Sequence, residues 1–131
     1  MKTSSNAGPL VLCVDDDQMI LDITKLALES VGYRVLTAND GRDAIKTFME
    51  EPVSAVVLDY EMPGLNGTDL AKVMKRLDPD VPKLLFTGSS LPTEAAPYVE
   101  GYCPKMGGLR ALLLAVATLL PLAAAGTRIA S

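Results

Sequence analysis

Residues 11–17 read Val-Leu-Cys-Val-Asp-Asp-Asp, an apolar run that ends in three carboxylates. The same arrangement returns at residues 55–59, where Ala-Val-Val-Leu precedes Asp59. Uninterrupted apolar runs of this length are typical of parallel strands that are buried on both faces of a sheet. The carboxyl ends of such strands meet at one edge, where open α/β folds bind their ligands. We therefore expect these acids to lie together.

Two further apolar runs end in polar residues, Thr87 and Lys105. Helical periodicity separates the runs, and Asp17 and Asp40 are placed to cap two of the helices. The expected strands are residues 11–14, 33–38, 55–58, 83–86 and 102–103. The expected helices are residues 18–31, the segment between Asp40 and Pro52, residues 68–77 and residues 109–122. In helix 68–77 the residues expected to face the core are Leu70, Val73, Met74 and Leu77.

Alternation of strands and helices predicts an α/β fold, a doubly wound five-stranded parallel sheet of flavodoxin-like order 2-1-3-4-5. The switch point of this order lies between the first and third strands, which deliver Asp15, Asp16 and Asp59. Cys13 and Cys103 would lie three strands apart, about 14 Å. A disulfide needs Cα atoms within about 7 Å, so both cysteines are expected to be buried thiols.

The polar residues at the strand ends suit phosphoryl transfer to a carboxylate. Asp59 is the candidate nucleophile, which would form an acyl phosphate. Because two anions repel, the reaction needs a divalent cation, and Mg²⁺ prefers carboxylate, phosphate and water oxygens. Asp16 and Asp59 are candidate ligands, and Asp15 would hold a metal-bound water. Lys105 would pair with the phosphoryl charge and Thr87 would donate a hydrogen bond to it.

Four stretches resemble the receiver domains of two-component response regulators. The matching residues are Val14–Asp17, Val57–Gly67, Leu85–Gly88 and Tyr102–Lys105. The segment from Asp59 to Gly67 is the most specific, and the resemblance covers residues 9–122.

The resemblance implies a role for each matching residue. These roles are phosphoacceptor for Asp59, metal ligand for Asp15, Asp16 and the backbone carbonyl of Glu61, phosphoryl pairing for Lys105, and switch positions for Thr87 and Tyr102. It also implies a flavodoxin-like fold, bound Mg²⁺, and a phosphohistidine donor that is a sensor histidine kinase or a histidine phosphotransfer protein. Such a protein catalyses only its own phosphorylation and dephosphorylation, so we do not expect an enzyme in the usual sense.

The chain departs from the family pattern at two places. Lys105 is followed by Met106-Gly107 instead of the usual proline. Only residues 89–101 are available for the fourth helix with its two loops, and Pro92 and Pro97 fall inside this window. Proline costs about 3 kcal/mol inside a helix, so we expect the fourth helix to be shortened or missing.

Composition limits the classes of function. The chain of 131 residues has the size of one domain, with an expected flexible terminus at 1–8, a receiver at 9–122 and a tail at 123–131. A net charge of −4 argues against direct nucleic-acid binding. The lack of histidine excludes a phosphohistidine or histidine-ligated zinc on this chain. We expect a stand-alone cytoplasmic regulator whose output is contact with a downstream protein that the sequence does not name.

The last helix is unusually apolar. Residues 111–127 carry no charge, but Pro121 interrupts them and a membrane-spanning helix needs about 20 apolar residues, so no membrane segment is expected. The large side chains spread around this helix are Leu112, Leu113, Leu114, Val116, Leu119 and Leu120. They predict a partner interface, most simply a homodimer. The alternative is that Leu113 and Leu120 cover the ends of the core in a monomer.

Two other functions remain open at this point. A haloacid-dehalogenase-like phosphatase would use Asp15 as nucleophile and Asp17 as the second acid. It would also need an acidic pair after Lys105, where the sequence has none, and it leaves Asp59 unexplained. The other alternative is a receiver-like interaction scaffold that is never phosphorylated.

Overall fold

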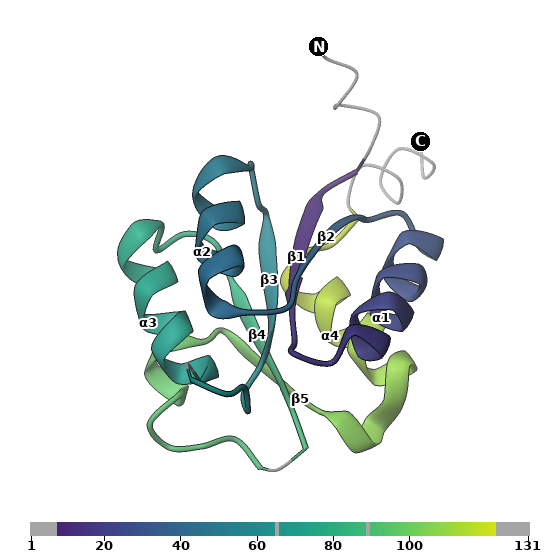
Figure 1. Cartoon of the computed structure of the whole chain (residues 1–131). Helices are drawn as coiled ribbons and strands as arrows, with labels where there is room; N and C mark the ends of the chain where they lie inside the picture. Colours follow the sequence, from purple (N-terminus) through teal and green to yellow (C-terminus); the bar gives the residue numbers. More distant parts are fainter. Residues whose placement is uncertain (1–7, 65, 89, 123–131) are drawn as a thin grey trace.

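A computed structural model of the chain describes residues 8–64, 66–88 and 90–122. Its centre is a five-stranded parallel sheet of order β2-β1-β3-β4-β5, which confirms the predicted topology (Figure 1). The strands are β1 (Leu10–Val14), β2 (Arg34–Ala38), β3 (Ala55–Asp59), β4 (Lys83–Thr87) and β5 (Gly101–Pro104). Of these, β1, β3 and β4 are buried along their whole length. Their apolar runs predict this burial, which also includes Lys83 at the start of β4.

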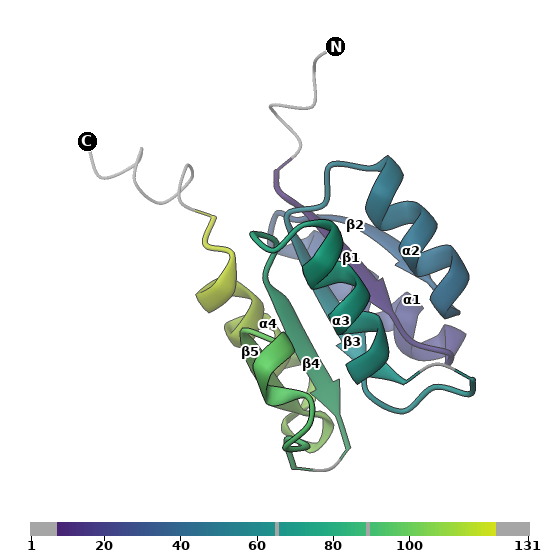
Figure 2. The same ribbon diagram turned by 90° about the vertical axis from the view of Figure 1, so that its left-hand side faces the viewer.

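Four α-helices cover the two faces of the sheet, and Figure 2 shows the layers from the side. They are α1 (Gln18–Ser30), α2 (Gly41–Glu50), α3 (Gly67–Leu77) and α4 (Gly108–Leu119). One face carries α1 and α4, which contact each other, and the other carries α2 and α3. The carboxylates of Asp17 and Asp40 cap α1 and α2, as predicted.

The inward face of α3 differs from the prediction. Val73 is 41% exposed and Leu77 is 45% exposed, whereas Leu70, Ala71 and Met74 are fully buried. Ala71 shares the core face, which turns that face away from Val73 and leaves Leu77 at its edge. The periodicity identified the helix correctly, but a small residue decided which side packs.

The connection between β4 and β5 contains no full helix. Among its described residues, the only helical segment is the three-residue 3₁₀ turn η2 (Ala96–Tyr98), with Pro97 inside it. This confirms the expectation of a shortened fourth helix. After β5, a second 3₁₀ turn, η3 (Lys105–Gly107), leads into α4. All peptide bonds among the described residues are trans, and this includes the bond that follows Lys105.

The last helix packs most of its large side chains against the core, although only two of them are fully buried. It ends at Leu119, three residues earlier than expected, and the segment from residue 123 lies outside the described residues. Leu112 and Val116 are buried, and Leu113, Leu119 and Leu120 pack against the same cluster. Only Leu114, at 65% exposure, faces away among the large side chains expected to spread around this helix. This packing agrees with the monomer alternative and weakens the reason for expecting a homodimer.

Two other expectations concern single residues and the membrane. Cys13 and Cys103 are free and buried, as the strand order requires. In the described part of the chain, no helix is both long and apolar enough to cross a bilayer. Of the expected terminal segments, residues 1–7 of the N-terminal segment 1–8 and the whole tail 123–131 lie outside the described residues.

Candidate functional site

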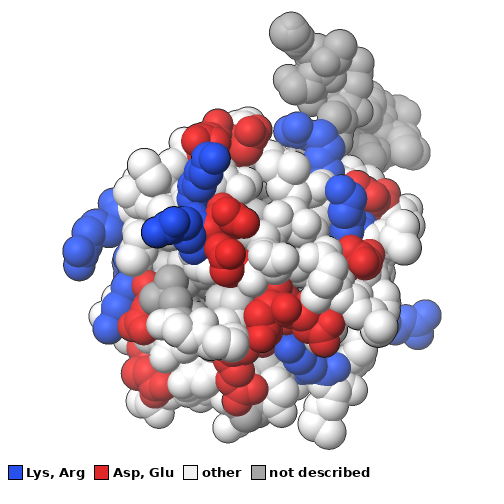
Figure 3. Space-filling view, in the orientation of Figure 1, with Lys and Arg blue, Asp and Glu red and all other residues white. Residues whose placement is uncertain are grey.

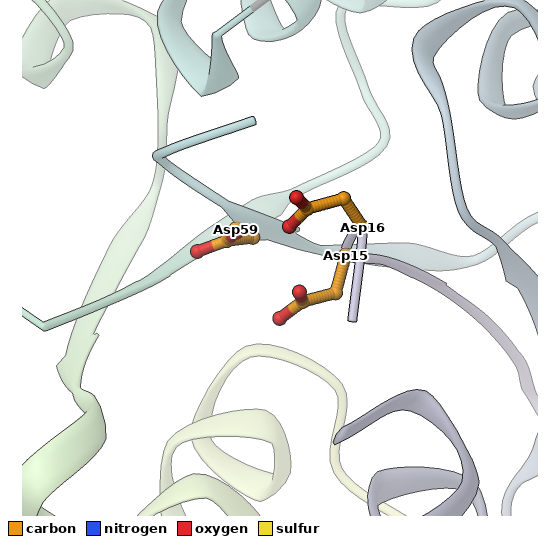
Figure 4. Close-up of side chains that lie close together, drawn as sticks. All are labelled: Asp15, Asp16 and Asp59. Carbon is orange, nitrogen blue, oxygen red and sulfur yellow. The ribbon is translucent and has the colours of Figure 1, made fainter. Parts of the chain in front are cut away.

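Three carboxylates gather at the carboxyl ends of β1 and β3 (Figure 4). Asp15 and Asp16 follow β1, and Asp59 is the last residue of β3. One carboxylate oxygen of each lies within 4.8 Å of the others. Because β1 and β3 are hydrogen-bonded neighbours, with Val14 beside Leu58, the sheet itself brings these distant residues together.

Two of the three acids are buried. Asp15 is 3% exposed and Asp59 is 4% exposed, whereas Asp16 lies at the surface. The pKa of Asp59 is raised to about 6, and burial is the largest cause. The hydrogen bond with Lys105 opposes this rise, the charge of Asp15 adds to it, and the charge of Lys105 and the backbone amide of Glu61 oppose it. Burial also raises the pKa of Asp15. At pH 7 Asp59 is mostly ionised, but its charge is held at a cost in free energy.

Lys105 bridges the two buried acids. Its Nζ lies 2.9 Å from Asp59 Oδ1 and 3.3 Å from Asp15 Oδ2. Burial lowers the pKa of Lys105, but its hydrogen bond and ion pair with Asp59, and those with Asp15, outweigh that effect and raise the pKa overall. The side chain starts at η3, so the changed sequence after Lys105 does not prevent its ammonium from reaching the site.

The charges of the site fit a divalent cation. When all three aspartates are ionised, one ammonium leaves two negative charges uncompensated. Oxygen ligands on opposite sides of Mg²⁺ lie about 4.2 Å apart, since each bond is about 2.1 Å. The observed limit of 4.8 Å between carboxylate oxygens is close to that span. Asp15, Asp16 and Asp59 therefore suit a magnesium site with small side-chain movements.

Of the remaining candidate residues, Thr87 and Glu61 lie at the edge that carries the acids, whereas Tyr102 lies within β5. Thr87, the last residue of β4, is 1% exposed and comes directly after Phe86, which pairs with Asp59. Tyr102 is half-buried on β5 and pairs with Leu85. Glu61 is exposed, and its backbone amide donates a hydrogen bond to Asp59. The structure thus brings Thr87 and Glu61 to the edge that carries the acids, and it places Tyr102 two positions before the end of β5.

A family model, "Response regulator receiver domain", matches residues 11–101. The chain belongs to this family. The match ends before Lys105, so the family model does not include this lysine. Its assignment to the site depends on its ion pairs with Asp59 and Asp15. The carboxylate of Asp17 caps α1 by accepting hydrogen bonds from Met19 N and Ile20 N. It therefore has a structural role here, whereas the haloacid-dehalogenase-like alternative needs it as the second acid of the reaction.

Curated relatives share only this domain with the chain. Autoinducer 1 sensor kinase/phosphatase LuxN of Vibrio harveyi is 33% identical over 66% of this chain and 10% of its own length. Response regulator SaeR of Staphylococcus aureus is 39% identical over 61% of this chain and 35% of its own length. The chain therefore matches about a tenth and about a third of these two proteins.

Solved receivers have the same fold. Chemotaxis protein CheY4 of Vibrio cholerae is 27% identical with a TM-score of 0.81, covering 87% of this chain and 100% of that chain. Response regulator TrrA of Thermotoga maritima, solved in complex with Mg(2+)-BeF, is 30% identical with a TM-score of 0.81, covering 86% and 99%. A chain in the complex of histidine kinase ThkA with response regulator TrrA is 29% identical with a TM-score of 0.79, and the match covers 86% of this chain and 98% of that chain.

Two further contacts near Asp59 were not predicted from the sequence motifs. Tyr60, next to Asp59, donates a hydrogen bond of 2.5 Å from its hydroxyl to Glu94 in the β4–β5 connection. A Cβ on Gly67 would lie 2.7 Å from Asp59 O and 2.9 Å from Tyr60 Cα, so only glycine lets the loop return to β3. The turn sequence marked Gly67 as special, but nothing in the sequence pointed to the pairing of Tyr60 with Glu94.

Proposed function

We propose that this receiver takes a phosphoryl group onto Asp59 from a phosphohistidine of a sensor histidine kinase or a histidine phosphotransfer protein. One observation carries the proposal. The buried carboxylate of Asp59 lies 2.9 Å from Lys105 Nζ and within 4.8 Å of two more carboxylates, at the switch point of the sheet. No structural role requires three acids to be crowded in this way, because their charges repel.

The transfer is a displacement at phosphorus. A carboxylate oxygen of Asp59 forms the new P–O bond, the P–N bond to the donor histidine breaks, and its electron pair stays on the imidazole nitrogen. Lys105 then exchanges part of its pairing with Asp59 for pairing with the phosphoryl oxygens. Asp15, Asp16, Asp59 and the backbone carbonyl of Glu61 would hold Mg²⁺, which supplies the positive charge that lets two anions meet.

An apolar hollow beside the site suits the donor protein. Its volume is about 210 Å³, and its lining includes Ile20 and Ile23 of α1, Phe86 of β4 and Leu109 of α4, next to Lys105. Large apolar side chains are exposed nearby, with Met19 at 70% and Met106 at 90%. Exposed apolar surface of this kind marks protein contacts. We propose that the donor docks here, and Ile23→Lys should slow transfer from a kinase while leaving phosphorylation by acetyl phosphate unchanged.

Phosphorylation would be read out through Thr87 and Tyr102. The Thr87 hydroxyl would move toward the phosphoryl group, and the Tyr102 ring would move into the space it leaves, as a shift between two existing states. The surface that changes would then bind a downstream protein. Two buried free thiols agree with a reducing compartment, and we place the protein in the cytoplasm.

Incubation with acetyl phosphate and Mg²⁺, followed by intact mass measurement, tests the proposal. We expect one added phosphate on the wild type, none in chelator and none on Asp59→Asn. The surface variant Asp80→Asn should be phosphorylated like the wild type. An unmodified wild type would instead favour the alternative of an interaction scaffold that is never phosphorylated. The observation that favours this alternative is the short β4–β5 connection, which changes the surface of the domain without changing the acidic site.

A further inference from the structure

A second hollow, about 320 Å³ in volume, lies on the flank of α3 away from the acidic site. Its lining consists of Lys72, Lys75 and Arg76 of α3 and Tyr98 of η2. All three cations are exposed, and the lining contains no acid. Basic side chains project from the left edge of the molecule in Figure 3, where α3 lies in Figure 1. On a chain with a net charge of −4, this is a local concentration of positive charge.

The 3₁₀ turn η2 positions two of the three cations, Lys72 and Lys75. Lys72 Nζ lies 5.3 Å and Lys75 Nζ lies 5.7 Å from the centroid of the Tyr98 ring, within the range of cation–π attraction. Lys75 Nζ also donates a hydrogen bond of 3.1 Å to the carbonyl of Pro97. Tyr98 itself packs against the core. The side chains are therefore partly ordered before any ligand binds, which lowers the entropic cost of binding.

The positive charge of the hollow is not neutralised within the fold. Among the described residues, no carboxylate lies within 4.0 Å of Lys72, Lys75 or Arg76, although ion pairs do form at Lys25, Lys83 and Lys105. The short β4–β5 connection contributes to this exposure, since the described part of the connection packs a three-residue turn, not a full helix, against α3.

We propose that this hollow docks an acidic segment of a partner protein. Carboxylates are the groups that match an ordered set of ammonium and guanidinium donors. A volume of about 320 Å³ admits a few side chains of an extended segment, not a folded domain. The surface is separate from the phosphoacceptor, so the proposal stands whether or not Asp59 is phosphorylated.

A peptide fits this surface better than a nucleic acid does. Nucleic-acid binding relies on a row of phosphate contacts along a basic stripe. Here the three cations occupy adjacent turns of one helix, and Asp69, Asp78 and Asp80 lie exposed on the same helix or just beyond its end. Tyr98 is also occupied by the two lysine ammonium groups, which reduces its value as a platform for base stacking.

The test is binding of fluorescein-labelled hexaglutamate to the full chain at low salt, followed by anisotropy. The triple variant Lys72→Gln, Lys75→Gln, Arg76→Gln should weaken binding about tenfold. The matched control, Arg42→Gln, Lys46→Gln, Arg110→Gln, removes the same charge from exposed positions on α2 and α4 and should change affinity by less than about twofold. Urea unfolding of each variant checks that all are folded.

A second variant separates organisation from charge. Tyr98→Leu keeps every cation but removes the ring that positions two of them, and should weaken binding about threefold. Equal loss in the two triple variants, or no loss in either, would overturn the proposal. Tighter binding of an oligothymidylate of equal charge than of hexaglutamate would also overturn it and assign the surface to nucleic acid.

Discussion

Replacing Asp59 by asparagine should stabilise the metal-free protein at neutral pH. The carboxyl group is 4% exposed, and its pKa is raised from 3.8 to about 6, mainly by burial. Ionising the Asp59 carboxyl therefore costs more free energy in the folded state than in the unfolded chain, even with Lys105 beside it. Asparagine has nearly the same shape and carries no charge, so the substitution removes this penalty.

The size of the effect follows from the pKa shift. One pKa unit corresponds to about 1.4 kcal/mol, so a rise from 3.8 to about 6 sets a ceiling of about 3 kcal/mol. Between these two pKa values the folded state binds more protons than the unfolded state. The contribution of Asp59 to the stability of the wild type therefore falls as the pH rises from about 4 to above 6. The gain from Asp59→Asn should be small near pH 4 and fully developed at pH 7.5.

Urea unfolding in EDTA at several pH values between 4 and 8 measures this difference. The control is Asp80→Asn, which removes an exposed carboxylate and should shift the free energy of unfolding by less than about 0.5 kcal/mol. The reasoning would be refuted if Asp59→Asn were no more stable than the wild type at pH 7.5. It would also be refuted if the gain did not change with pH.

Three further predictions concern the metal, the ion pair between buried Lys83 and exposed Glu100, and the switch. Mg²⁺ at a hundred times its Kd should raise the free energy of unfolding of the wild type by about 2.7 kcal/mol and that of Asp16→Asn far less, and melting curves that do not respond would argue against a metal site. Lys83 is fully buried, and its ammonium lies 3.3 Å from Glu100. In urea unfolding, Glu100→Gln should destabilise the protein by about 2 kcal/mol because it leaves a buried ammonium without its counterion, whereas Lys83→Met should be nearly neutral. The opposite order of the two variants would contradict this role of the pair. Thr87→Ala should still be phosphorylated but lose the amide spectral changes that beryllofluoride and Mg²⁺ induce, and unchanged spectral responses would rule out the switch.

The sequence by itself was enough to predict the sheet and the acidic edge. Strands buried on both faces have nearly continuous apolar sequences, and alternation of strands and helices indicates a doubly wound sheet, whose flavodoxin-like order places β1 beside β3. The residue after each strand is then placed without further information. Asp15, Asp16, Asp59 and Thr87 could be located in this way, and prolines in the β4–β5 window predicted the lost helix.

Only the tertiary structure decided how these residues interact. The contact of Lys105 with both buried acids, and the raised pKa of Asp59, depend on burial and distances that no local pattern contains. The same holds for the exposed Val73 and for the hydrogen bond from Tyr60 to Glu94. Periodicity reports which side of an element is apolar on average. Which side chains are covered, and which charges meet, is set by segments far apart in the chain that pack together only in the folded protein.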